Sequence, residues 1–247
     1  MEPIFAIMLF AGGILEGLYA STVGCGSLVS IPLLLLTGMP IHTAIGTNRF
    51  SVIFLEAASA MKFQSKKKIT WKYAVIIGLI ASCGSVIGSS LVINIDEKHL
   101  NIATAIILAV VILLVIVKDK LGLKENPHPK INWTAVSAAV FLLGIYGGFL
   151  GAGFGTSITL VFVMMGFNFI TGAANSRIVG LIMSVPATII FAHNGMINYE
   201  YGLSLGLGTT IGGWIGAGIG IKKGNTFVKT LFIIVVLASI IKLALGL

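Results

Sequence analysis

The chain has 247 residues, of which 57% are hydrophobic and only 10% are charged, and its mean hydropathy is +1.05. Soluble domains carry about 25% charged residues, so this composition excludes a soluble enzyme and favours a membrane protein. The net charge of +8 does not indicate nucleic-acid binding, because the lysines lie beside apolar segments, as in the cytoplasmic loops of membrane proteins.

The first apolar segment follows an N-terminus that contains Glu2 and no Lys or Arg. It lacks the charged start of a cleavable signal peptide, so we expect it to remain attached as the first membrane segment. The two cysteines, Cys25 and Cys83, both lie within apolar runs. They exclude a disulfide framework.

The two halves of the chain resemble each other. Residues 17–26 match residues 144–153 at an offset of 127 (144 minus 17), and after a one-residue insertion the match continues at 128. The pairs at the second offset are Gly38 with Gly166, Thr43 with Thr171, Arg49 with Arg177, Ile69 with Ile197, Gly78 with Gly206, Gly84 with Gly212 and Gly88 with Gly216. The sequence therefore predicts a duplication, with a first repeat at 1–120, a cytoplasmic connector at 121–132 and a second repeat at 133–247.

Each half is expected to form five apolar helices, a short pair around a Gly-rich break and then three longer spans. The predicted ranges are 4–20, 27–38, 42–61, 73–93 and 100–117, and then 133–149, 155–166, 169–192, 201–221 and 228–246. A crossing needs about 20 apolar residues, and the paired helices are shorter. We therefore interpret each pair as a hairpin that enters and leaves the membrane on one side.

Lysine positions predict the orientation of the two halves. Residues 62–72 hold five lysines and are expected in the cytoplasm, whereas their counterpart at 193–200 has no Lys or Arg. The turn at 96–98 is acidic on balance, but its counterpart contains Lys222 and Lys223. We therefore predict an all-α polytopic membrane protein of two inverted repeats, each a Gly-broken hairpin plus three transmembrane helices. Counting each pair as one broken span leaves eight crossings and parallel halves as an alternative.

The Gly-rich breaks are the first candidate binding elements. Glycine lets a backbone leave helical geometry and approach a ligand closely, and the helices that restart there direct N–H groups that favour anions. Tight helix packing is the alternative role. The candidate residues are Gly24, Cys25, Gly26 and Ser27 in the first half, and Gly153, Phe154, Gly155 and Thr156 in the second.

Arg49 and Arg177 are matched cations inside predicted spans. Burying an Arg at mid-membrane costs about 2.5–3.5 kcal/mol on insertion scales, and its planar donors suit oxyanions. Neighbouring polar side chains that could add hydrogen bonds are Asn48, Asn175, Thr43 and Thr171. Alternatively, each Arg reaches a lipid headgroup or pairs with a buried carboxylate.

Glu16 and Glu56 are the intramembrane acids, and Leu143 and Ser184 occupy their matched positions. Either acid could carry a coupling proton or neutralise an arginine. The four histidines lack metal-ligand spacing, so we predict no metal and no cofactor.

The order of these motifs resembles the sulfite exporter TauE/SafE family. The resemblance rests on the break before Ser27 and Pro32, the turn from Gly38 to Arg49, and the mirrored glycines at 151–155. It implies transport of sulfite, sulfonates or related anions across the plasma membrane of a bacterium or archaeon. Expected partners are a small anion and the lipid bilayer, and a homodimer is left open. Rival functions are transport of a cation or neutral solute with structural arginines, and thiol redox relay by Cys25 and Cys83.

Overall fold

The computed structural model describes residues 3–91, 122–126, 131–149 and 151–244, and every regular element in these ranges is an α-helix. Helical structure is expected here, because a chain crossing lipid must satisfy its backbone hydrogen bonds internally. The helices are α1 (Pro3–Val23), α2 (Ser27–Leu35), α3 (Ile41–Ser65), α4 (Trp71–Leu91), α6 (Trp133–Phe149), α7 (Phe154–Met164), α8 (Phe169–His193) and α9 (Tyr199–Ala244).

Most predicted helices are confirmed, and one length prediction is wrong. Helix α1 has 21 residues, which is about 31 Å at 1.5 Å per residue, so it is long enough to cross a membrane unaided. With α4 and α8 it is one of three described helices that meet both length and hydropathy criteria for a span. Gly224, with φ 86° and ψ 177°, divides α9 near the predicted boundary. The span expected at 100–117 lies outside the described residues.

The second helix of each short pair folds back along the first. In the first half, the Oγ of Ser30 in α2 lies 3.2 Å from Oε1 of Glu16 in α1, and a side chain at Gly12 would collide with Leu33. Residues later in α2 therefore contact residues earlier in α1, so the two helices form an antiparallel hairpin. In the second half, Tyr73 contacts both Trp133 at the start of α6 and Phe167 just beyond α7. These shared contacts hold the open ends of that pair together.

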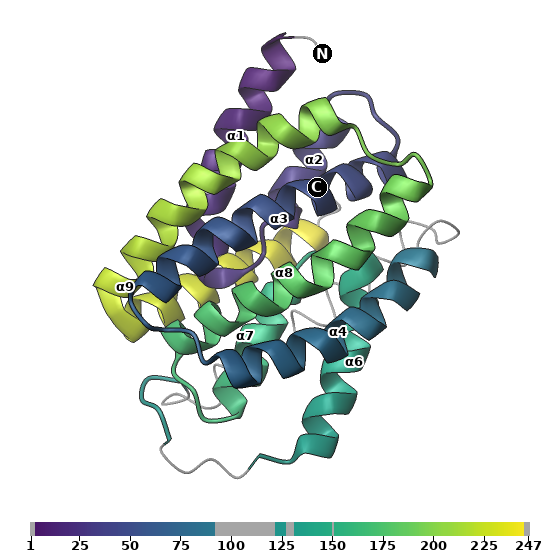
Figure 1. Cartoon of the computed structure of the whole chain (residues 1–247). Coiled ribbons are helices and arrows are strands. Elements are labelled where there is room, and N and C mark those ends of the chain that lie inside the picture. The colour runs from purple at the N-terminus through teal and green to yellow at the C-terminus, as the bar shows by residue number, and fades with distance from the viewer. Residues whose placement is uncertain (1–2, 92–121, 127–130, 150, 245–247) are drawn as a thin grey trace.

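Outer helices pack in a reciprocal pattern: α1 lies against α9, and α6 lies against α4 (Figure 1). A Cβ atom on Gly212 would lie 3.0 Å from the Cα of Gly17, and one on Gly84 would lie 3.1 Å from the carbonyl carbon of Gly144. These glycines are matched pairs in the duplication. The same kind of crossing therefore occurs twice between the halves, and small residues permit the close approach.

Helices α3 and α8 lie between these two outer pairs and run antiparallel (Figure 1). The backbone N–H of Thr70, after α3, donates to Oδ1 of Asn175 near the start of α8 over 2.7 Å. Reciprocally, the N–H of Asn198, after α8, donates to Oγ1 of Thr47 near the start of α3 over 2.9 Å. The two bonds are related by the offset of 128 (175 minus 47, and 198 minus 70). The matched helices α3 and α8 thus point in opposite directions.

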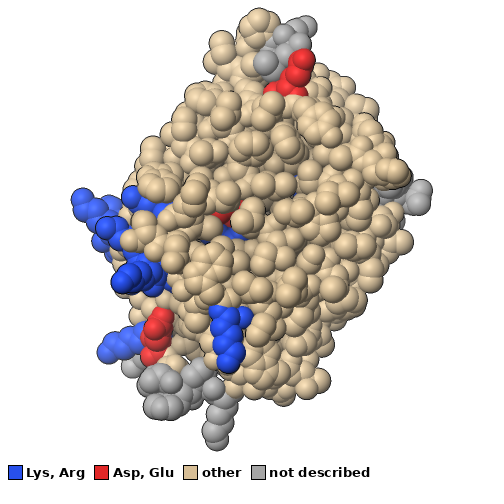
Figure 2. Space-filling model, viewed as in Figure 1, with Lys and Arg blue, Asp and Glu red and all other residues tan. Residues whose placement is uncertain are grey.

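Basic side chains gather where α3 ends and α9 bends. In Figure 2 they lie at the left and lower parts of the molecule, and the upper part of this face shows none. Lys62, Lys66 and Lys222 lie together at this end.

Candidate functional site

The two Gly-rich breaks meet between the halves. A Cβ atom on Gly24 would lie 2.5 Å from both the carbonyl carbon of Gly155 and the nitrogen of Thr156, and Gly24 has a φ of 96°. Both the available space and the left-handed backbone therefore require glycine there. The hydroxyl of Thr156 donates to the carbonyl of Val23 over 2.7 Å. The breaks thus form one central junction between the repeats.

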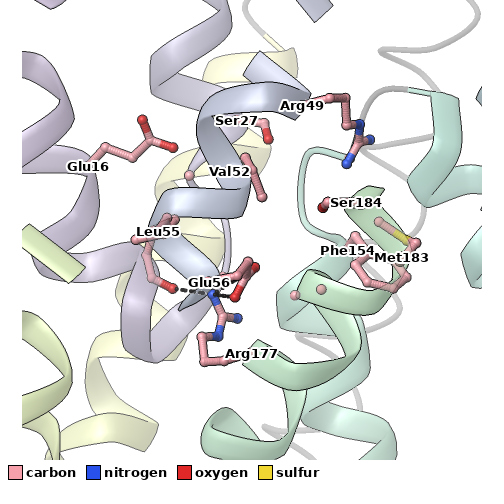
Figure 3. A pocket seen from close by; sticks show the side chains of 16 residues that line it. Glu16, Ser27, Arg49, Val52, Leu55, Glu56, Phe154, Arg177, Met183 and Ser184 are labelled. Carbon is pink, nitrogen blue, oxygen red and sulfur yellow. Dashed lines mark hydrogen bonds and ion pairs between the residues drawn. The ribbon is translucent and has the colours of Figure 1, made fainter. Parts of the chain in front are cut away.

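A small cavity of about 20 Å³ lies beside this junction (Figure 3). That volume accommodates about one water molecule, so the cavity has no room for a larger solute in this conformation. Predicted site residues that line the cavity are Gly24, Gly26, Ser27, Arg49, Phe154, Gly155, Arg177, Glu16 and Glu56. The two arginines and two glutamates, widely separated in sequence, therefore share one site.

Arg49 is 2% exposed and reaches the cavity from α3. Its Nη2 donates to the carbonyl of Gly147 in the other half, while its Nε has no hydrogen-bond partner within the described residues. A Cβ atom on Gly151 would lie 2.5 Å from the Cζ of Arg49, so the glycine gives the guanidinium room. Among the residues that the structure describes, no carboxylate forms an ion pair with Arg49.

Arg177, in contrast, is neutralised. It is 1% exposed, and its Nη1 lies 3.2 Å from Oε2 of Glu56 on α3. The same nitrogen donates to the carbonyl of Ala20 over 3.1 Å. Figure 3 shows this pair on one side of the cavity and the Arg49 guanidinium on another. One of the two matched arginines therefore takes the carboxylate-paired role that the sequence left open.

Glu16 differs from Glu56. It is 1% exposed on α1, and its Oε1 lies 3.2 Å from the Oγ of Ser30, whose shorter hydrogen bond goes to Asn48. Its Oε2 has no hydrogen-bond partner, and no cation within the described ranges pairs with it. Gly26 packs against this carboxyl group. Glu16 is thus a buried acid that is not balanced by an arginine.

Several predicted contact residues do not line the cavity. Asn48 instead donates to Ser27 over 2.9 Å and accepts from Ser30 over 2.7 Å, which fixes the start of α2 against α3. Asn175 holds the backbone of Thr70. The Asn48 side chain and the Oδ1 of Asn175 are thus engaged in positioning helices, while the Nδ2 of Asn175 is buried without a hydrogen-bond partner in the described residues.

The two threonines also lie away from the cavity. Thr171 is at the start of α8, where its hydroxyl donates to Glu125 of the connector over 2.6 Å. Thr43 is partly exposed near the start of α3. Cys25, Gly153 and Thr156 belong to the breaks but are not among the lining residues.

Helix α8 adds lining residues that sequence reasoning missed, among them Gly180 and Ser184. A Cβ atom on Gly180 would lie 2.5 Å from Oε1 of Glu56, so this glycine lets the carboxylate approach Arg177. Ser184 is fully buried, and its hydroxyl has no partner within the described residues. The signal for Ser184 was its match to Glu56 in the duplication.

The cysteines do not form a common site. Cys25 is buried beside Thr156, with 2.8 Å between Sγ and Oγ1, whereas Cys83 is exposed on α4. In the described ranges, no group of three or more His, Cys, Asp or Glu residues is placed to hold a metal ion.

This arrangement of apolar helices around a buried, charged junction defines the chain as a membrane protein of the transporter class. The family model for Sulfite exporter TauE/SafE matches residues 9–243, and the chain belongs to this family.

Curated relatives carry the same general description. A probable membrane transporter protein, ORF9, from Sinorhizobium sp is 26% identical over 95% of this chain and 90% of its own length. A probable membrane transporter protein from Haemophilus influenzae is 26% identical over 92% and 89%, and YdhB from Bacillus subtilis is 26% identical over 87% and 88%. No solved structure is significantly similar to the chain. The chain is therefore a membrane transporter of the TauE/SafE family.

Proposed function

We propose that this transporter carries a small sulfur-containing anion, such as sulfite or a sulfonate, across the plasma membrane of a bacterium or archaeon. Arg49 is the proposed anion contact. The observation that carries this proposal is a buried guanidinium that lines the cavity and has no carboxylate partner in the described part of the chain.

Electrostatics support an anion at this position. A buried charge is costly unless it is paired, and the Gly147 carbonyl supplies only a partial negative charge to Arg49. A bound oxyanion would accept from the remaining donors of the guanidinium in its planar geometry. Helices α2 and α7 also begin at the cavity, with Ser27 and Phe154 in its lining. Their N-terminal dipoles add to the attraction for negative charge.

Inverted repeats form the architectural part of the proposal. The antiparallel α3 and α8, together with the reciprocal bonds of Thr70 and Asn198, support it. In such transporters the substrate site lies at the repeat interface and becomes accessible from each side in turn. The cavity has room for about one water, so anion entry requires the halves to separate. The lysine-rich end is proposed to face the cytoplasm.

Proton coupling is assigned to Glu16 rather than Glu56. Glu56 is held in an ion pair with Arg177, whereas Glu16 lines the same cavity without a cationic partner in the described ranges. A carboxyl group at such a site can accept a proton without breaking an ion pair. Substrate and proton would thereby meet in one cavity.

The experiment is flux into proteoliposomes that contain the purified protein. Labelled sulfite, a sulfonate such as sulfoacetate, sulfate and a small carboxylate are compared at fixed membrane potential, with Arg49→Ala measured in parallel. Uptake of a sulfur anion that is saturable and lost in Arg49→Ala supports the proposal. Equal uptake by both proteins, or uptake of a cation or neutral solute instead, contradicts it and makes Arg49 structural.

A further inference from the structure

A second candidate site shares no lining residue with the central cavity and lies on the surface between the end of α3 and the middle of α9. It is a groove of about 540 Å³. Lys62, Lys66 and Lys222 line it, and Trp214, Ile215 and Ile219 of α9 form most of its apolar wall. None of its lining residues is acidic.

The apolar wall is exposed. Trp214, Ile215 and Ile219 are 42%, 46% and 40% exposed. From Trp214 to Lys222 is eight residues, which corresponds to about 12 Å along a helix. The groove therefore combines an ammonium-rich end with an apolar strip along α9, which is an amphipathic shape.

Lys62 is already positioned for a ligand at the junction of these two parts. Its Nζ lies 4.8 Å from the centre of the Trp214 ring, a cation–π contact. Gly218 lies under the end of this side chain, where a Cβ atom would be 3.0 Å from the Cε of Lys62. The lysine stem thus packs along the apolar wall while its charge stays at the open end.

We infer that this groove binds an anionic phospholipid. The headgroup phosphate would lie among Lys62, Lys66 and Lys222, and an acyl chain would cover Trp214, Ile215 and Ile219. Its lysines place the groove at the lysine-rich end of the molecule, which the proposed cytoplasmic orientation would set at the level of the lipid headgroups; Figure 2 shows where the basic side chains gather. Basic pockets between membrane helices on the cytoplasmic side suit anionic headgroups. A soluble phosphate would leave the apolar wall uncovered, so the complementarity favours a lipid.

Tryptophan fluorescence tests this inference without measuring transport. Phe replaces Trp71 and Trp133, leaving Trp214 as the only tryptophan. The protein is reconstituted in equal mixtures of phosphatidylglycerol and phosphatidylcholine, with bromine on the acyl chains of either lipid in turn. We expect brominated phosphatidylglycerol to quench Trp214 at least twice as strongly as brominated phosphatidylcholine.

Two matched triple variants separate a specific site from general attraction. Lys62→Gln/Lys66→Gln/Lys222→Gln removes the groove lysines, and Lys68→Gln/Lys72→Gln/Lys223→Gln removes the same charge from the same end without touching the groove lining. The first should bring the quenching ratio of the two lipids to about 1, and the second should leave it high. Equal quenching in the parent, or an equal fall in both variants, overturns the inference. Weak quenching by both lipids also overturns it, because another protein copy would then cover the groove.

Discussion

Arg49 and Arg177 occupy matched positions in the two repeats and begin from the same anchoring contact. Arg49 donates to the carbonyl of Gly147, and Arg177 donates to that of Ala20. These carbonyls are themselves matched at the offset of 127 (147 minus 20). The arginines then diverge, because only Arg177 is paired with Glu56 within the described residues. A symmetric scaffold thus carries an asymmetric charge distribution.

The asymmetry comes from the carboxylates. Glu16 and Glu56 both belong to the first repeat, while their counterparts Leu143 and Ser184 are uncharged. The predicted duplication would account for two arginines at one junction. The unmatched acids explain why one of them is neutralised and the other is available to a ligand.

The largest expected effect comes from breaking the Arg177 pair. Arg177→Met leaves the Glu56 carboxylate buried without its cation and should cost about 3–5 kcal/mol of stability. Arg177→Met/Glu56→Met should recover most of this loss, because neither charge remains. Arg49→Met should cost less than Arg177→Met. Thermal unfolding in detergent measures all three, and equal losses for the two single arginine variants would contradict the comparison.

The two matched helix crossings provide the next test, because substitutions at them are expected to lower stability by similar amounts. Gly84→Leu and Gly212→Leu insert side chains at the two matched contacts, α4 against α6 and α9 against α1, and overpacking costs about 1–3 kcal/mol. Cys83→Leu, an exposed neighbour on α4, is the control and should have little effect. Unfolding temperatures and the yield of monodisperse protein report the outcome. A large loss in only one glycine variant would show that the crossings are not equivalent.

Replacing Glu16 and replacing Glu56 should affect proton coupling differently. The Glu16→Gln variant is expected to retain anion flux. That flux should no longer depend on an imposed pH gradient, because the variant lacks the carboxyl group that is proposed to carry the coupling proton. Glu56→Gln should retain that dependence wherever gel filtration shows folded protein. Flux with and without the gradient measures both variants. Full gradient dependence in Glu16→Gln would rule out the proposed coupling residue.

A substitution at Thr171 is expected to have the smallest effect on stability. Thr171→Val removes the hydrogen bond to Glu125, worth about 1 kcal/mol, and should leave anion binding unchanged because Thr171 does not line the cavity. The readouts are the unfolding temperature and its shift on adding sulfite. If sulfite no longer raised the unfolding temperature of this variant, Thr171 would be an anion contact after all.

Much of the scaffold could be predicted because its signals are local or repeated. Apolar runs gave most helix positions, and the glycine breaks marked the turns at 24–26 and 151–153. The constant repeat offset identified Arg49 and Arg177 as matched candidates for one binding site, and both line the same cavity. The end of α1 was misjudged, because Ser21 and Thr22 suggest a polar boundary although they are buried within the helix.

The detailed partners could not be predicted. Glu56 pairs with an arginine 121 residues away (177 minus 56), and no sequence spacing signals that contact. Asn48 and Asn175 look like ligand contacts because they lie near arginines, yet Asn48 donates to Ser27 and the Oδ1 of Asn175 accepts from Thr70, and neither residue lines the cavity. Such assignments depend on side-chain packing between helices that are distant in sequence.

Anion-dependent thermal stability tests the central claim most directly. Purified parent protein, Arg49→Ala and Thr171→Val are unfolded with sulfite, sulfoacetate, taurine, sulfate, thiosulfate, acetate or chloride. A ligand at 100 times its Kd should add about 2.7 kcal/mol. We predict saturable stabilisation by one class of sulfur anion in the parent and in Thr171→Val, and none in Arg49→Ala. A response that survives in Arg49→Ala, or no response from the parent to any of these anions, would contradict Arg49 as the anion contact.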